Sequence, residues 1–575
     1  MSTLFLQRTH SHHRRAHRRV FALSAAVACS LGLTAVAAQT PLQTPGASTA
    51  HKRAADRIQS SQLRDYLTFI ASDELGGRDT PSNGLDTAAR FLAAMCSRAG
   101  LKGGGDNGTF YQDIALKRSS VDASKSVLSV NGRAFRPGVD FVPGNGSFFG
   151  GATPGSASGG VVYVGHGWTV AAKNINPYGT LDLKGKFALV NYDQGSLPKG
   201  ISPDDLQGEP GKAYETPDVA VKNRGGVGIL FIPRFSVLAN FERAAQAGGR
   251  SQFQPEKFMS GAGGISAATL GPAPLSELLR GAPQSAEALF TRGATGEFPE
   301  SFALDANRTV QVTVGGESET ARTQNVVAIL EGSDPVLKQE FVALGAHYDH
   351  VGTRAMGEGD RIFNGADDDG SGTTALLAIA EAVAAGPRPK RSLLFVWHAG
   401  EEKGLWGSRF FTESPTVPIE KIVAQLNIDM IGRSKGAADM VAANANLSGP
   451  NQIYVIGSKI MSDELGAVSE AVNKSYLKLD FSYKYDDPKD PNRFFYRSDH
   501  INYARKGIPI IFYFDGVHED YHRATDHADK IDYQKMTAVT KTVCATAMAL
   551  ADLPKRPKVD RPLSPEVAGG GRRRR

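Results

Sequence analysis

Histidine and carboxylate residues that can bind a metal or move a proton follow several apolar segments in the second half of the chain. The apolar segment 341–345 leads into Ala346-His347-Tyr348-Asp349-His350. A neutral imidazole is a good zinc ligand, and a carboxylate commonly receives the other ring N–H and fixes the tautomer. His347 is therefore a candidate metal ligand, and Asp349 is a candidate orienting partner or supporting carboxylate.

Three adjacent aspartates, Asp367, Asp368 and Asp369, precede a helix expected to begin near Thr373. Neighbouring carboxylates repel one another unless water or a cation screens them. Acidic residues near a helix N-terminus also complement the helix dipole, which explains one aspartate more easily than three. The nearby histidines favour zinc or another transition metal over calcium as the bound cation.

Three further acidic or basic groups follow later apolar segments. Glu401 and Glu402 come after the segment 393–397. One of two such glutamates can bind metal while the other takes a proton from metal-bound water. Asp429 follows the segment 423–428, although a single aspartate there is commonly a turn residue. The last apolar segment is followed by three histidines, among which spacing cannot choose: His518, His522 and His527.

From residue 324 onward, apolar strand patterns alternate with helix patterns. Nearly continuous apolar strands with helices between them predict an α/β fold, in which helices cover both faces of a sheet. Ligands bind such sheets beyond the carboxyl ends of the strands, where five successive strands each offer His, Asp or Glu. This recurrence favours an enzyme over a structural protein. The expected strands are 326–330, 340–345, 392–397, 423–428 and 508–514, and the expected helices are 373–385 and 537–550.

The rest of the chain divides into parts that differ in the pattern of their apolar residues. Residues 57–103 have helical spacing of apolar residues, whereas short β-type runs separated by Gly, Pro, Asn and Ser clusters fill the region from 119 to 304. We therefore predict these parts: 39–118, an N-terminal helical part of the catalytic domain; 119–304, a β-rich insertion; 305–553, the main catalytic domain; and 554–575, a flexible basic tail.

The N-terminus has the order of a signal peptide. Basic residues from Arg14 to Arg19 precede the apolar run Val20 to Leu33, and small residues then lead to Ala37 and Ala38. We predict that residues 1–38 are cleaved near these alanines and that the mature protein is exported, either to the periplasm or outside the cell, with no stable membrane span. A twin-arginine signal at Arg18-Arg19 is less favoured, because a histidine stands where serine or threonine is usual.

Charge and cysteine content exclude some classes of protein. The formal net charge of +6 comes mainly from the predicted leader and from the tail Arg572 to Arg575, so no clustered basic face for nucleic acid is expected. Cys29 lies in the leader, and the remaining Cys96 and Cys544 allow one disulfide at most. Any metal must therefore be held by histidines and carboxylates. The oligomeric state is not predictable from the sequence.

The ordered motifs resemble the zinc aminopeptidase and glutamate-carboxypeptidase-like family of peptidases. That resemblance implies a phosphorylase/hydrolase-like mixed α/β sheet, two co-catalytic Zn²⁺ ions and peptide or protein substrates. The stretch from Leu67 to Leu116, with Asp73-Glu74-Leu75-Gly76-Gly77-Arg78, is similar to the family's N-terminal lead-in. The motifs that carry the resemblance are Gly345 to His350, Gly365 to Gly372, Gly400-Glu401-Glu402, Asn427 to Met430 and Tyr521-His522.

Carried over position by position, the resemblance assigns a role to each candidate residue. Asp368 would bridge both zinc ions, His347 and Asp429 would complete one site, and Glu402 and His522 would complete the other. Glu401 would be the general base on a zinc-bound water. Asp349 would support His347, and Tyr521 would help to hold the tetrahedral intermediate. Ser498-Asp499-His500 also looks like a family motif, but no ligand role is assigned to it.

The β-rich insertion is similar to a protease-associated domain, which implies a role as a lid or in substrate access.

Removal of residues from the amino end of peptides is the favoured activity. Three alternatives remain: a carboxypeptidase of the same family, a glutaminyl-cyclase-like acyltransferase, and a non-catalytic binding protein.

Overall fold

The computed structural model describes residues 46–144, 154–192, 197–206, 211–238, 241, 252–259, 266–564 and 567–568. The predicted signal peptide with its cleavage site and the arginines at the C-terminus lie outside these residues. The predicted export of the protein therefore stays a prediction.

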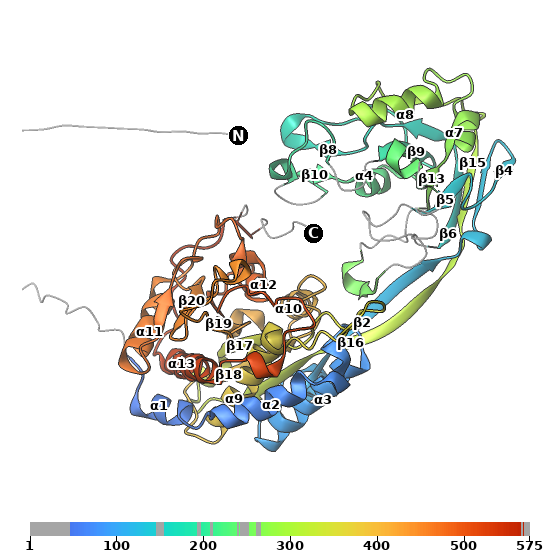
Figure 1. Ribbon diagram of the computed structural model, residues 1–575. Helices are drawn as coiled ribbons and strands as arrows, with labels where there is room; N and C mark the ends of the chain where they lie inside the picture. The colour runs from blue at the N-terminus through green and yellow to red at the C-terminus, as the bar shows by residue number, and fades with distance from the viewer. Residues whose placement is uncertain are drawn as a thin grey trace, which may run out of the picture. The chain divides into compact units, whose positions relative to one another are not determined.

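A mixed sheet carries the candidate site residues (Figure 1). Among the described residues, ten strands form this sheet, and its central strands β18, β17, β19 and β22 run parallel. The predicted α/β fold with a mixed sheet is confirmed. The strand order is β12 (Gln254–Pro255), β2 (Tyr111–Val121), β16 (Gly316–Leu330), β18 (Ser392–His398), β17 (Phe341–His347), β19 (Ile422–Ile428), β22 (Ile510–Phe514), β20 (Gln452–Ile456) and β21 (Asp480–Ser482), with β1 (Lys102–Gly103) paired to β16.

Helices pack on both faces of this sheet because the strands are apolar on both faces. Along β18, Leu393 and Phe395 belong to one buried cluster, whereas Leu394 and Val396 belong to another, as the two-residue period of a strand requires. The first cluster includes residues of α2 (Ser60–Ile70), α3 (Asn83–Arg98), α9 (Gly372–Ala384), α11 (Asp463–Ser475) and α13 (Tyr533–Asp552). The second includes residues of α10 (Trp406–Glu413) and α12 (His500–Ala504), which lie across the sheet from α9 in Figure 1.

The long antiparallel pair β2 and β16 was not expected at its full length. Tyr111 pairs with Val326 at one end and Val121 pairs with Gly316 at the other, so β2 runs through residue 119 without a break. The first half of β16 is rich in exposed polar residues such as Glu317 and Glu319. Its sequence therefore lacks the apolar pattern from which a strand is predicted.

Three further sheets of the described residues lie between β2 and β16 in the chain, and the smallest pairs β8 (Thr169–Val170) with β10 (Tyr214–Glu215). A six-stranded sheet has the order β14 (Phe302–Ala303), β7 (Val161–Tyr163), β9 (Phe187–Tyr192), β11 (Gly228–Pro233), β13 (Ser266–Leu270) and β5 (Phe141–Pro143). A four-stranded sheet has the order β4 (Arg133–Phe135), β3 (Val127–Val130), β15 (Val310–Val314) and β6 (Gly155–Gly159). The insertion is thus β-rich, as predicted, but it also contains α4 (Pro217–Asn223), α7 (Pro272–Leu278) and α8 (Ala286–Thr295).

The two cysteines left open by the sequence do not pair. Cys96 and Cys544 are both buried free thiols. Burial raises the pKa of each thiol to about 12, so neither is a reactive thiolate at neutral pH.

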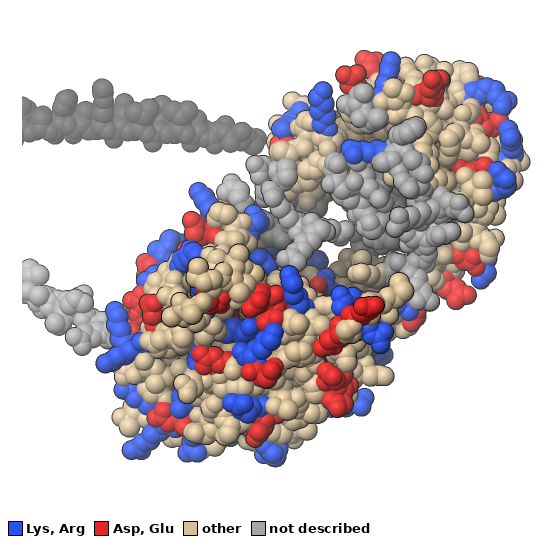
Figure 2. All heavy atoms as spheres, in the orientation of Figure 1, with Lys and Arg blue, Asp and Glu red and all other residues tan. Residues whose placement is uncertain are grey.

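The sequence predicts neither a nucleic-acid partner nor a stable membrane span, and the surface and the helices concern these two predictions. On the face drawn in Figure 2, basic and acidic side chains are interspersed over the described residues. Within the described part of the chain, every helix is too short or too polar to cross a bilayer. The absence of a nucleic-acid partner stays a prediction.

Acid is expected to destabilise the fold through His500. Burial lowers the pKa of this imidazole to about 4, whereas the unfolded chain protonates it near pH 6.5. The unfolded state therefore binds more protons between these values, and the stabilisation by neutral His500 is lost as the pH falls from 6.5 towards 4. The loss is on the order of 3 kcal/mol.

Urea unfolding of the wild type and of His500→Gln at pH 7 and pH 5 measures this effect. We expect the wild type to lose more unfolding free energy than the variant between the two pH values. Equal losses would show that burial of His500 does not contribute.

Candidate metal centre

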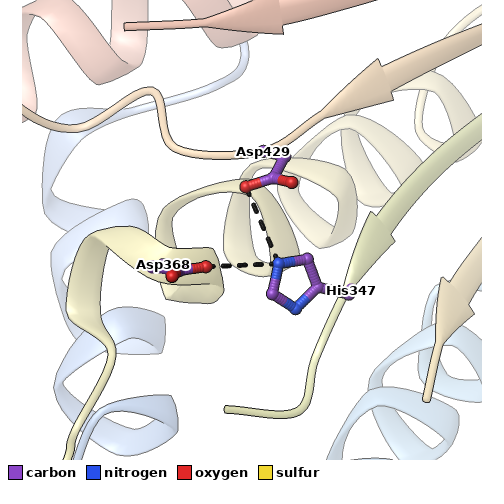
Figure 3. A group of neighbouring side chains, drawn as sticks. All are labelled: His347, Asp368 and Asp429. Atoms are coloured by element: carbon purple, nitrogen blue, oxygen red, sulfur yellow. Dashed lines mark ion pairs between the residues drawn. The ribbon is translucent and has the colours of Figure 1, made fainter. Parts of the chain in front are cut away.

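The first candidate site lies at the carboxyl ends of β17 and β19. His347 is the last residue of β17, Asp429 follows β19, and Asp368 lies in the turn Ala366–Ser371 before α9. Figure 3 shows the three side chains converging on one point. The Nε2 atom of His347 lies 3.3 Å from Asp368 Oδ1 and 3.6 Å from Asp429 Oδ1. Atoms that bind one tetrahedral zinc ion lie about 3.3–3.6 Å apart, so this spacing fits a metal ion.

A second candidate site shares Asp368 with the first. Asp368 Oδ2 lies 3.1 Å from His522 Nε2, which is also 3.0 Å from Glu402 Oε2. His350 Nδ1 lies 2.9 Å from Glu402 Oε1 and 3.9 Å from Asp368 Oδ2. Because the two oxygens of Asp368 face different histidines, this carboxylate is placed to bridge two ions.

These groups fit metal ions by their chemistry as well as by their spacing. Imidazole nitrogen and carboxylate oxygen are ligands of zinc. His347, Asp368 and Asp429 are all buried, and the sites offer Asp368 Oδ2 and Glu402 Oε1 as buried atoms without a hydrogen-bond partner among the described residues. A cation supplies the partner that such oxygens otherwise lack.

Burial and neighbouring charges shift the pKa values of the site in opposite directions. Burial disfavours ionised Asp368, but the surrounding histidines hold its pKa well below the usual range. Burial also opposes a charged His522, yet the adjacent carboxylates of Asp368 and Glu402 raise its pKa to about 10. Burial, reinforced by the adjacent carboxylates, raises the pKa of Glu401 well above its usual value. Since metals bind neutral imidazoles, metal binding here must displace protons.

Asp349 connects the first strand end to the glutamate pair. The Nδ1 atom of His347 lies 3.1 Å from the backbone carbonyl oxygen of Asp349 and 3.7 Å from its carboxylate. The Asp349 carboxylate instead accepts the backbone N–H groups of Glu401, at 3.1 Å, and Glu402, at 3.4 Å. Asp349 thus fixes the loop that holds both glutamates as well as the ring of His347.

The three adjacent aspartates have three different environments. Asp368 alone faces both histidine clusters. The Asp369 carboxylate accepts the backbone N–H groups of His347, Gly372 and Met430. Asp367 accepts the N–H of Gly432 and contacts His518 Nε2 at 3.2 Å.

Of the three histidines left open by spacing, the structure places only His522 in a candidate site. His518 pairs with Asp367, and His527 lies 3.3 Å from Asp360 on the surface. Tyr521 stacks on the ring of His522, with centroids 3.9 Å apart, and accepts a hydrogen bond from Arg497 at 3.2 Å.

Arg78 supports the site and was not recognised from the sequence. Its guanidinium is fully buried and donates hydrogen bonds to the carbonyls of Tyr348 and Asn364 at 2.9 and 2.6 Å, and of Gly365 at 3.0 Å. These carbonyls flank the segments that carry His347 and Asp368. The Asp73 to Arg78 motif was the available signal, but nothing in its spacing indicates where the side chain points.

Ser498, for which the sequence indicates no role, donates a hydrogen bond from its hydroxyl to Asp429 Oδ2 at 2.5 Å. It accepts a hydrogen bond from the Asn427 amide at 2.8 Å, which fixes its orientation. Second partners of this kind orient metal ligands. Asp499 and His500 contact His398 and the Phe495 carbonyl, away from both clusters.

The variant Ser498→Ala is expected to weaken metal binding about 10–100-fold, because Asp429 loses its orienting partner. Competition with a chromophoric chelator measures the affinity. Ser475→Ala is the matched control, since that hydroxyl contacts only Val472 and Ala47 in the described chain. Unchanged affinity in Ser498→Ala would contradict the orienting role.

Comparison with families of known proteins finds similarity in the region of the chain that holds the candidate sites. The model of peptidase family M28 matches residues 325–547. "Leucine aminopeptidase 2" of Arthroderma otae is 26% identical over 310 residues, which cover 48% of this chain and 56% of that protein. "Leupeptin-inactivating enzyme 1" of Streptomyces exfoliatus is 29% identical over 215 residues, which cover 37% of this chain and 40% of that protein. The chain thus spans about half the length of the curated relatives it matches.

Among solved structures, an aminopeptidase from Aneurinibacillus sp. strain AM-1 is similar with a TM-score of 0.47 and 17% identity. That alignment covers 89% of this chain and 98% of the other. The region matched by the family model contains every residue of the two candidate sites. The part of this chain that is similar to peptidase family M28 is thus the part that holds both candidate sites.

Proposed function

We propose that this protein is an exported aminopeptidase that hydrolyses peptide bonds with two zinc ions. The observation that carries the proposal is the position of Asp368, whose two carboxylate oxygens face separate clusters of histidine and acidic residues. His347, Asp368 and Asp429 would hold one ion, and Asp368, Glu402 and His522 the other. When bound, such a pair of ions lowers the pKa of water and polarises the substrate carbonyl.

Glu401 is the proposed general base. Its backbone is held by Asp349, and its raised pKa makes its carboxylate a stronger base than an exposed glutamate. Glu401 accepts the proton of the attacking water and then delivers it to the nitrogen of the leaving amine. Both transfers occur at the same carboxylate, so one residue serves as base and then as acid.

Tyr521 is proposed to stabilise the oxygen that becomes negative during attack. Arg497 donates to the phenol oxygen, which leaves the phenol O–H available as a donor. Burial raises the pKa of Tyr521, so the phenol stays protonated at neutral pH. A fixed donor at this position contributes to catalysis only if it points at the developing charge.

Cleavage from the amino end and export are proposed on grounds other than the geometry of the site. The names of the similar leucine aminopeptidases favour cleavage from the amino end, and the basic, apolar and small-residue order of residues 1–38 favours export. The β-rich insertion is proposed to be a protease-associated domain that controls access to the site.

Digestion of an unblocked peptide and of its N-acetylated twin, followed by mass spectrometry with and without chelator, tests the activity. Stepwise loss of residues from the free amino end alone, abolished by chelator, is the expected result. Trimming of both peptides from the carboxyl end would instead identify a carboxypeptidase. Pyroglutamate formed from a Gln-initiated peptide would identify an acyltransferase, and unchanged peptides would favour a binding protein.

A further inference from the structure

His350 lies beside the second candidate site, and no role was assigned to it from the sequence. Its side chain is fully buried, and its Nδ1 atom is 2.9 Å from Glu402 Oε1. The ring occupies space that a side chain at position 365 would take, because a Cβ on Gly365 would lie 2.5 Å from His350 Cγ. The fold therefore keeps room for this imidazole next to Glu402.

The short distance between His350 and Glu402 is not a hydrogen bond. Neither ring nitrogen of His350 has a hydrogen-bond partner among the described residues, and the same is true of Glu402 Oε1 and Asp368 Oδ2. The nitrogen and the oxygen are close, yet the ring N–H does not point at the carboxylate. Two ligands of one metal ion have this relationship, because both lone pairs are directed at the ion between them.

His522 lies on the other side of the same glutamate. Glu402 presents Oε1 to His350 and Oε2 to His522, and Asp368 Oδ2 is 3.9 and 3.1 Å from these two histidines respectively. The rings stand edge to face, with centroids 5.7 Å apart. Two imidazoles thus flank one pair of carboxylates.

We propose that His350 is a fourth protein ligand of the second ion, together with Asp368, Glu402 and His522; this inference rests on the proposed two-ion centre. The first site, with His347, Asp368 and Asp429, has one imidazole and two carboxylates. The second has two imidazoles. Imidazole favours zinc and other late transition metals over manganese and magnesium. The second site is therefore expected to be more selective for zinc than the first.

Zinc X-ray absorption spectroscopy of the full chain, loaded with two zinc ions, counts the imidazole ligands directly. We expect three imidazoles for each pair of ions, from His347, His350 and His522. A count of two in the wild type would overturn the proposal and would leave His350 as an outer partner of Glu402. This measurement needs no variant, so it holds even if a substitution at this buried position prevents folding.

The variant His350→Gln gives a second readout. It is expected to lose one imidazole from the spectrum and to weaken binding of one zinc ion at least about tenfold in a chelator competition, while the other ion keeps its affinity. His527→Gln is the matched control, because His527 contacts Asp360 outside both clusters. An unchanged imidazole count in His350→Gln would also overturn the proposal.

Metal stoichiometry separates this inference from the proposed function. A wild-type protein that binds no pair of zinc ions and leaves peptides intact contradicts the proposed function. A protein that binds two ions and cleaves peptides with only two imidazoles bound contradicts the role of His350 alone.

Discussion

Replacing Glu401 with glutamine is expected to lower kcat by about 10²–10⁴-fold, the contribution that a general base typically makes. The amide has nearly the shape of the carboxylate but cannot accept the proton of the attacking water. The fold and the metal content should stay unchanged, because the hydrogen bond from Glu401 to Asp349 uses only the backbone N–H. Steady-state kinetics with an unblocked peptide, together with metal analysis of the same sample, measures both quantities.

Glu402→Gln is the matched comparison, since the two glutamates are adjacent and Asp349 accepts both of their N–H groups. Glu402 contacts His350 and His522, so its substitution should reduce zinc content as well as activity. If Glu401→Gln kept near wild-type kcat, or if it lost zinc as Glu402→Gln does, the assignment of the general base would be wrong.

Asp368→Asn is expected to weaken both ions together and to bring activity to the background level. One carboxylate supplies Oδ1 to the first cluster and Oδ2 to the second, and an amide nitrogen cannot replace either oxygen as a ligand. The loss of affinity should exceed the roughly 10–100-fold effect of removing an outer partner. Equilibrium dialysis at fixed free zinc, followed by metal analysis, gives the stoichiometry.

Asp369→Asn separates metal binding from the structural effect of a buried aspartate. The Asp369 carboxylate accepts three backbone N–H groups and contacts no histidine ring in the two clusters. We expect this variant to bind two ions but to be less stable by about 1–3 kcal/mol, because one buried N–H loses its acceptor. Retention of two ions by Asp368→Asn, or their loss from Asp369→Asn alone, would contradict the bridging role of Asp368.

The amino-acid sequence by itself determined the α/β fold of the catalytic part and the places where chemistry can occur. Each of β17, β18, β19 and β22 is a nearly uninterrupted apolar run, which identifies a strand buried on both faces. The polar residues that end these runs must then lie at one edge of the sheet, because the strands are parallel. His347, the pair Glu401-Glu402 and Asp429 are candidates on such local patterns alone, whereas the choice of Glu402 as the ligand came from the family resemblance.

Only the tertiary structure decided which side chains meet. Spacing could not distinguish His522 from His518 and His527, since all three lie in the segment between β22 and α13. Polar strands such as the first half of β16 have no apolar pattern to reveal them. The support of the site by Arg78, Ser498 and His350 depends on contacts between residues far apart in the chain. Such contacts are fixed by packing of the whole domain, and no local pattern of residues encodes them.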